Sequence, residues 1–108
     1  MNTKIKLLDQ TFEFRKSSYS YKDFEDRNKR PYNPSLASDI LEYIYSCIVA
    51  GYFYKRIDCP LDLVGFYELI DQMEEHDAEL LYKDNSKLFQ ELFNLGTAVE
   101  AEEPAKKK

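Results

Sequence analysis

Two short stretches near the N-terminus alternate between polar and apolar residues, and they constrain the fold more than any other feature of the sequence. The alternation runs through residues 4–8 and 11–15, and Asp9 and Gln10 interrupt it. This period of two predicts a β-hairpin whose buried face carries Ile5, Leu7, Phe12 and Phe14. A lone two-stranded hairpin is only marginally stable in water, so other elements must cover that face.

Beyond the hairpin, the apolar residues recur at helical spacing. We expect a first helix that is capped by Ser20 and ends before Pro31. Asn33 or Ser35 is then expected to cap the strongest helix of the chain, which reaches at least Gly51. Its apolar stripe is Leu36, Ile40, Ile44, Cys47, Ile48 and Gly51.

Two further helices are predicted in the C-terminal half. One is expected to be capped by Asp58 or Cys59, with Pro60 in its first turn and an apolar face of Leu63, Phe66, Ile70 and Met73. The last is expected to be capped by Ser86 and closed by Gly96.

The chain of 108 residues is long enough for one domain. We therefore predict an α+β fold in which an N-terminal β-hairpin packs on a bundle of three to four α-helices, within residues 1–96. Residues 97–108 are mostly small or acidic and end in three lysines. A segment of this composition cannot bury enough apolar surface to fold. We predict a disordered tail there.

Few residues in this chain are suited to catalysis or to metal binding. A single histidine, His76, lies in an acidic run, and there is no second histidine to complete a zinc motif. Cys47 and Cys59 lack the paired spacing of a metal site, so we expect reduced thiols. Three glycines cannot form a phosphate-binding loop. We expect a protein that is not an enzyme and that uses no cofactor or metal.

Charge is distributed unevenly along a chain whose net charge is −5. Residues 1–30 carry eight basic and five acidic side chains, residues 31–105 carry four basic and fifteen acidic ones, and the last three residues are lysines. This polarity suits head-to-tail self-association or a charged partner, and it equally suits a protein that simply stays soluble.

The basic N-terminal third gives one alternative function, nucleic-acid binding. Three tyrosines in this third lie among basic residues, where they could stack on bases. The tyrosines are Tyr19, Tyr21 and Tyr32, and the basic residues are Lys22, Arg27, Lys29 and Arg30. A sequence pI near 4.9 argues against this use, because nucleic-acid-binding domains are usually far more basic.

Aromatic residues of the central helix indicate a protein partner. Its inner stripe is already supplied by isoleucines, which leaves aromatic rings for other faces, and tyrosine is favoured at interfaces. The predicted partner-binding residues are Tyr45, Tyr52, Phe53 and Tyr54. The alternative is that these rings complete a small core that has no tryptophan.

The third helix is expected to have an acidic edge that aids solubility or orientation. Its residues are Glu68, Asp71, Glu74 and Glu75.

No targeting or membrane-spanning segment is evident in the sequence. The N-terminus has no apolar run behind a basic stretch, and the most apolar window, residues 40–54, is shorter than the roughly 20 residues that span a bilayer. We expect a soluble protein of the cytoplasm.

The succession of elements resembles the tail assembly chaperones of long-tailed phages and the related small proteins of gene transfer agents. The resemblance covers residues 3–95 and is carried by the hairpin, by residues 21–25, by the apolar run of residues 41–51 and by residues 63–71. It implies a non-catalytic role in the host-cell cytoplasm. Such a chaperone binds the tape-measure protein, helps to recruit the tail-tube protein and is absent from the finished virion. A small nucleic-acid-associated or regulatory phage protein is the alternative.

Overall fold

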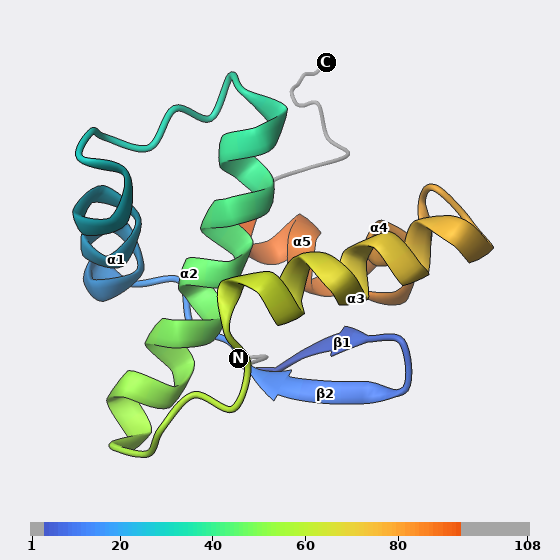
Figure 1. Ribbon diagram of the computed structural model, residues 1–108, viewed down its shortest axis with the longest axis horizontal. Helices are drawn as coiled ribbons and strands as arrows, with labels where there is room; N and C mark the ends of the chain where they lie inside the picture. Colours follow the sequence, from blue (N-terminus) through green and yellow to red (C-terminus); the bar gives the residue numbers. More distant parts are fainter. Residues whose placement is uncertain (1–3, 94–108) are drawn as a thin grey trace.

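The computed structural model describes residues 4–93, and side chains through residue 90 (Figure 1). It is an α+β structure with two strands at the N-terminus followed by helices, as predicted. In chain order the elements are β1 (Lys4–Leu7), β2 (Gln10–Glu13), α1 (Ser18–Asn28), α2 (Ala37–Lys55), α3 (Leu63–His76), α4 (Leu80–Asp84) and α5 (Ser86–Phe93).

The hairpin has the predicted buried face, but its turn is Leu8–Asp9 rather than the predicted break at Asp9–Gln10, because Gln10 already pairs with Leu7. β1 and β2 are antiparallel, with Ile5 opposite Phe12 and Leu7 opposite Gln10. The four predicted core residues Ile5, Leu7, Phe12 and Phe14 are all buried. Leu8 in the two-residue turn has a φ of 58°, a conformation that usually favours glycine. Packing of Leu8 against the core accompanies this unusual choice of residue.

Helices cover the hairpin in the way that its marginal stability requires. The apolar helix α2 lies at the centre, with α1 along one side, while α3 passes above the hairpin and α4 and α5 lie behind α3 (Figure 1). β2 packs against α2, and β1 packs against α3 and α4. The core therefore lies where the helices meet the apolar face of the two strands, and it includes Phe24 of α1 and Leu88 and Phe89 of α5.

A glycine lets α2 approach β2 at backbone distance. A Cβ at Gly51 would lie 2.6 Å from the Phe14 nitrogen and 2.7 Å from the Glu13 carbonyl carbon. Close by, the Arg15 backbone N–H donates to the carbonyl oxygen of Cys47 at 2.8 Å, which joins the end of the hairpin to the middle of α2. Gly51 was expected near the end of this helix, but α2 continues through Tyr52, Phe53 and Tyr54 to Lys55.

The predicted cap of α1 is wrong by three residues. Ser17, with an extended backbone, precedes the helix, and its N–H donates to the Ser20 hydroxyl at 2.9 Å. Ser20 is instead a buried residue inside the helix, where its hydroxyl lies 2.8 Å from the Tyr43 hydroxyl. Several serines near the start of α1 can cap a helix. Because Ser20 contacts Tyr43 of α2 inside the helix, Ser17 is left to precede it.

The predicted cap of α2 is also wrong, because Leu36 rather than Asn33 or Ser35 precedes its first residue. Asn33 is used in the preceding loop, where its side-chain oxygen accepts from the Ser35 N–H at 2.9 Å and its own N–H donates to Asp39 at 3.0 Å. The first apolar position, Leu36, is consequently exposed, and the buried part of the stripe begins later in the helix.

Three corrections apply to the C-terminal half. Asp62, not Asp58 or Cys59, caps α3, and its carboxylate accepts from the Gly65 N–H at 2.7 Å, so Pro60 lies in the preceding loop. Residues 80–84 form the short helix α4, which the sequence pattern did not predict, and Ser86 is the first residue of α5 rather than its cap. Gly96 and the predicted tail lie outside the described residues.

Asn85, between α4 and α5, protects the outer edge of β1. Its side-chain oxygen accepts from the Lys6 N–H at 2.7 Å, and its amide nitrogen donates to the Lys6 carbonyl at 2.8 Å and to the Leu81 carbonyl at 2.9 Å. The amide thus makes both hydrogen bonds that a neighbouring strand would make at Lys6. An edge strand left open is a template for aggregation, so this contact both stabilises and protects the hairpin.

Replacing Asn85 by aspartate is expected to lower the free energy of unfolding by about 2 kcal/mol. A carboxylate cannot donate to the Lys6 and Leu81 carbonyls, and it would place a negative charge beside both acceptors. Urea denaturation followed by circular dichroism measures the change. The exposed Gln90→Glu variant alters the charge equally and should leave stability near that of the wild type; equal losses in the two variants would contradict the role of Asn85.

Candidate interaction surface at the end of α2

The four residues predicted to bind a partner do not share one surface. Tyr45 is only 7% exposed, and its hydroxyl donates to the Leu61 carbonyl at 2.9 Å. Its ring lies 5.5 Å from that of Phe66, so it joins α2 to α3. The prediction that Tyr45 faces a partner is therefore wrong, because the turn before α3 supplies a buried acceptor for its hydroxyl. For this residue the alternative of a core role is the correct one.

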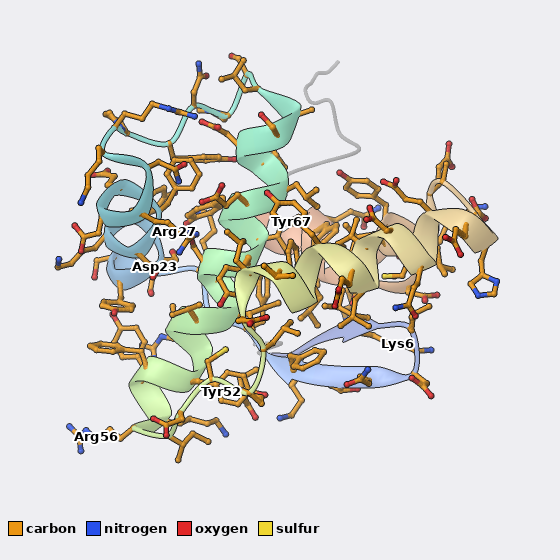
Figure 2. All side chains as sticks on the ribbon, in the orientation of Figure 1. Lys6, Asp23, Arg27, Tyr52, Arg56 and Tyr67 are labelled. Atoms are coloured by element: carbon orange, nitrogen blue, oxygen red, sulfur yellow. The ribbon has the colours of Figure 1, made fainter. Side chains whose placement is uncertain are left out.

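Tyr52, Phe53 and Tyr54 lie together in the last turn of α2. Tyr52 is half-buried against the core, whereas Phe53 is 50% and Tyr54 38% exposed. Figure 2 shows Tyr52 and Arg56 at the C-terminal end of the helix, with Arg56 pointing away from the molecule. Ile57 is 57% exposed. We call the surface formed by Tyr52, Phe53, Tyr54, Arg56 and Ile57 the α2-end surface.

Contacts from α1 and from the end of the hairpin hold these rings in place. The Phe53 ring stacks on Tyr19, with centroids 3.7 Å apart and planes 3° from parallel. Tyr54 meets Phe53 edge-on at 5.3 Å, and the Arg15 guanidinium lies 3.9 Å from the centroid of the Tyr54 ring. Such pairs restrict the rotamers of exposed side chains, so a partner would bind a surface that is already ordered.

The end of α2 exposes an aliphatic residue that sequence reasoning missed. Arg56 has a φ of 62°, and its N–H and that of Ile57 donate back to the carbonyls of Phe53 and Tyr52 at 3.0 and 3.3 Å. This left-handed turn closes the helix and leaves Ile57 in solvent. An Arg in place of the usual glycine gives no signal of such a turn, so the sequence does not indicate that Ile57 is exposed at the end of the helix.

A shallow depression of about 120 Å³ adjoins the aromatic rings, where β2 meets α2. Its lining combines apolar and charged groups: Glu13, Phe14, Arg15, Gly51, Tyr54 and Lys55. The Glu13 carboxylate lies 2.6 Å from the Lys4 ammonium and 3.5 Å from that of Lys55. The hydrogen bond from Lys4, with the charges of both lysines, holds the pKa of Glu13 below its ordinary 4.5 despite some opposing desolvation.

The cations of the alternative nucleic-acid surface are largely neutralised within the chain. Lys22 pairs with Asp26 at 2.6 Å. Arg30 makes two hydrogen bonds of 2.7 Å to the buried Asp39 carboxylate, and these hold the pKa of Asp39 below its ordinary 3.8. These three of the four sequence-predicted cations therefore already have acidic partners: Lys22, Arg27 and Arg30.

Arg27 is the most connected of these cations, and it joins α1 to α2 (Figure 2). It contacts Asp23 at 2.6 Å, Glu42 at 2.7 Å and the Ser46 hydroxyl at 2.8 Å. Asp23 and Arg27 lie on the side of α1 that faces α2. The geometry makes this arginine part of the helix–helix contact rather than of a surface that meets phosphate.

The two cysteines have raised pKa values. Cys47 is buried in the core, and burial raises its pKa to about 12. Burial also raises the pKa of Cys59, whose thiol donates to the Leu61 carbonyl at 3.1 Å. His76 is exposed at the far end of α3. Among residues 4–93, no group of three or more ligand-type side chains is placed to hold a metal ion.

The acidic edge predicted for α3 lies on the surface. Glu68, Asp71, Glu74 and Glu75 are all exposed, and none of them makes an ion pair with another described residue. Val64, on the same helix, is 67% exposed. The edge therefore carries negative charge that is not compensated by the part of the chain that the structure describes.

Comparison with known proteins adds no relative. A scan against protein-family models matches no family, and searches of the curated proteins and of the solved structures find no match. Within the described residues, no helix has both the length and the apolar character that crossing a membrane requires.

Proposed function

We propose that this chain is a non-catalytic assembly chaperone, which binds an apolar segment of a protein partner through the α2-end surface. One observation carries the proposal: Phe53 and Tyr54 at the end of α2 and Ile57 just after it are exposed, and Tyr19 and Arg15 order the two aromatic rings. Aromatic and aliphatic side chains that are ordered before binding are typical anchors of protein interfaces.

The resemblance of the element order to phage tail assembly chaperones gives the proposal its partner. In this account the α2-end surface holds the tape-measure protein in the host-cell cytoplasm until the tail-tube protein is recruited. A tape-measure gene directly downstream of the gene for this chain is then expected. Its absence would leave the partner without support, although the binding surface would remain a proposal.

The observations favour a protein partner over nucleic acid. A base needs an open ring face on which to stack, and one face each of Tyr19, Phe53 and Tyr54 is already covered within the chain. The pairing of Lys22, Arg27 and Arg30 with carboxylates further weakens the nucleic-acid alternative.

The Phe53→Ser/Tyr54→Ser double variant is expected to lose at least about tenfold in affinity for the tape-measure protein. The substitutions remove two apolar anchors while leaving the core of α2 intact. Co-expression with the tape-measure protein encoded beside this chain, followed by affinity purification of the complex, measures the effect. Circular dichroism establishes whether the variant keeps its helices.

Tyr82→Ser is the matched control, because Tyr82 is another exposed aromatic residue with an edge-on contact, to Phe89 of α5. It should bind as the wild type does. Binding that survives in the Phe53→Ser/Tyr54→Ser variant, or that is lost equally in Tyr82→Ser, would contradict the assignment of the surface.

A further inference from the structure

The charges that remain after intramolecular pairing are sorted to different parts of the molecule. Lys22 and Arg27 on α1, and Arg30 just after it, are paired with carboxylates. The basic groups around the α2-end surface outnumber their acidic neighbours, with Arg15, Lys55 and Arg56 against Glu13 and Asp58. The exposed part of α3 is acidic. A chain of net charge −5 thus keeps a locally positive end.

The exposed side of α3 has a regular pattern. Val64, Glu68, Asp71 and Glu75 follow at intervals of four, three and four residues, so they form one stripe along the helix. The stripe lies opposite the buried face of Phe66, Leu69, Ile70 and Met73. At 1.5 Å per residue it is about 16 Å long, with a bare aliphatic group at one end and carboxylates along the rest. We call it the α3 stripe.

We propose that the α3 stripe of one copy of this chain docks on the α2-end surface of a second copy, in a head-to-tail arrangement. Val64 would pack beside Phe53 and Ile57, and the carboxylates of the stripe would meet Arg15 and Arg56. The two surfaces are complementary in both charge and apolar content. They also lie on different elements that point in different directions, α2 downward and α3 to the right in Figure 1.

The geometry favours head-to-tail contact over a two-fold dimer. A symmetric dimer through either surface alone would bring like charges together, carboxylates at the α3 stripe or guanidinium groups at the α2-end surface. Contact between the two different surfaces pairs opposite charges and leaves one surface free on each terminal copy, so further copies can add. The inference concerns this chain alone and can be tested without a partner; because it uses the same α2-end surface, a second copy and the tape-measure segment would compete for that surface.

Sedimentation velocity of the full chain over a concentration series tests this inference. At about 0.01 M salt, where the screening length is about 30 Å, the wild type is expected to associate increasingly with concentration. At about 1 M salt, where that length is about 3 Å, it should be monomeric. A wild type that stays monomeric at low salt would overturn the inference and assign both surfaces to other partners.

Charge reversal identifies the surfaces. Arg15→Glu/Arg56→Glu makes both surfaces negative, and Asp71→Lys/Glu75→Lys makes both positive, so each variant alone should associate at least about tenfold more weakly than the wild type. An equimolar mixture of the two should associate again, because each variant supplies a complement of the other. Association that persists in either variant alone would overturn the inference of head-to-tail docking. A mixture that stays monomeric while both variants keep their helices would overturn it as well.

Discussion

Replacing Gly51 by alanine is expected to lower the free energy of unfolding by about 2 kcal/mol, although alanine is the better helix former. A Cβ at this position would lie 2.6 to 2.8 Å from the Phe14 nitrogen and from the carbonyl carbon and Cβ of Glu13. Two of these atoms are backbone, so α2 and β2 must separate to admit the methyl group. Separation would also weaken the hydrogen bond from Arg15 to Cys47. Urea denaturation measures the loss.

The direction of the change makes this variant informative. Glycine to alanine in an unobstructed helix interior stabilises by about 1 kcal/mol. Gly65→Ala is the control, because its Cβ would meet side-chain atoms rather than backbone, Asp62 Oδ1 at 2.9 Å and Leu61 Cδ1 at 3.2 Å, so the helix cap is disturbed but no two elements must separate. The loss there should be smaller. A Gly51→Ala protein as stable as the wild type would mean that α2 does not approach β2 this closely.

The second large effect is expected at Arg27, where methionine should lower the free energy of unfolding by about 3 kcal/mol. Methionine keeps much of the apolar volume but leaves Asp23 and Glu42, whose side chains are mostly buried, facing each other without a cation. The Ser46 hydroxyl, which is also buried, loses its donor. Thermal denaturation should register this as a melting temperature lower by at least about 10 °C.

Lys22→Met is the matched control for Arg27→Met, because it removes a cation from the same helix. Lys22 and Asp26 are both well exposed, so their ion pair is screened by water and should contribute little. We expect the melting temperature of Lys22→Met to stay close to that of the wild type. Similar losses in both variants would indicate that net charge, and not the contact between α1 and α2, determines the stability.

The hairpin could be predicted because its signal is local. Alternation in residues 4–15 identifies both strands and the four buried residues, but it places the break at Asp9 and Gln10, one residue beyond the turn that sets the register. The long helix was equally clear from its apolar spacing. These elements need no knowledge of distant parts of the chain, since periodicity alone separates strand from helix.

Features that depend on distant contacts could not be predicted. In the sequence Asn85 is typical of a turn, yet its side-chain amide hydrogen-bonds to the backbone of Lys6, 79 positions earlier in the chain. Tyr45 has the same local pattern as the exposed aromatic residues, and only the Leu61 carbonyl makes it a core residue. The helix caps were missed for a related reason, because neighbouring serine, asparagine and aspartate side chains compete and tertiary packing chooses among them.

The candidate surface was found in part. Tyr52, Phe53 and Tyr54 were identified because they lie outside the apolar stripe of α2. Ile57 and Arg15 were not, because a left-handed turn and the end of the hairpin bring them to the surface. Tyr19 was assigned to the nucleic-acid alternative, and its stack on Phe53 instead makes it part of the proposed protein-binding surface.

Nuclear magnetic resonance of the isotope-labelled chain, titrated with the tape-measure protein encoded beside it, tests the central proposal most directly. We expect the largest changes in chemical shift or line width at Tyr19 and at residues 52–57, with little change on the exposed side of α5. The same titration on Phe53→Ser/Tyr54→Ser should leave the spectrum almost unchanged. Changes centred away from the α2-end surface, or no change with the wild-type chain, would contradict the account.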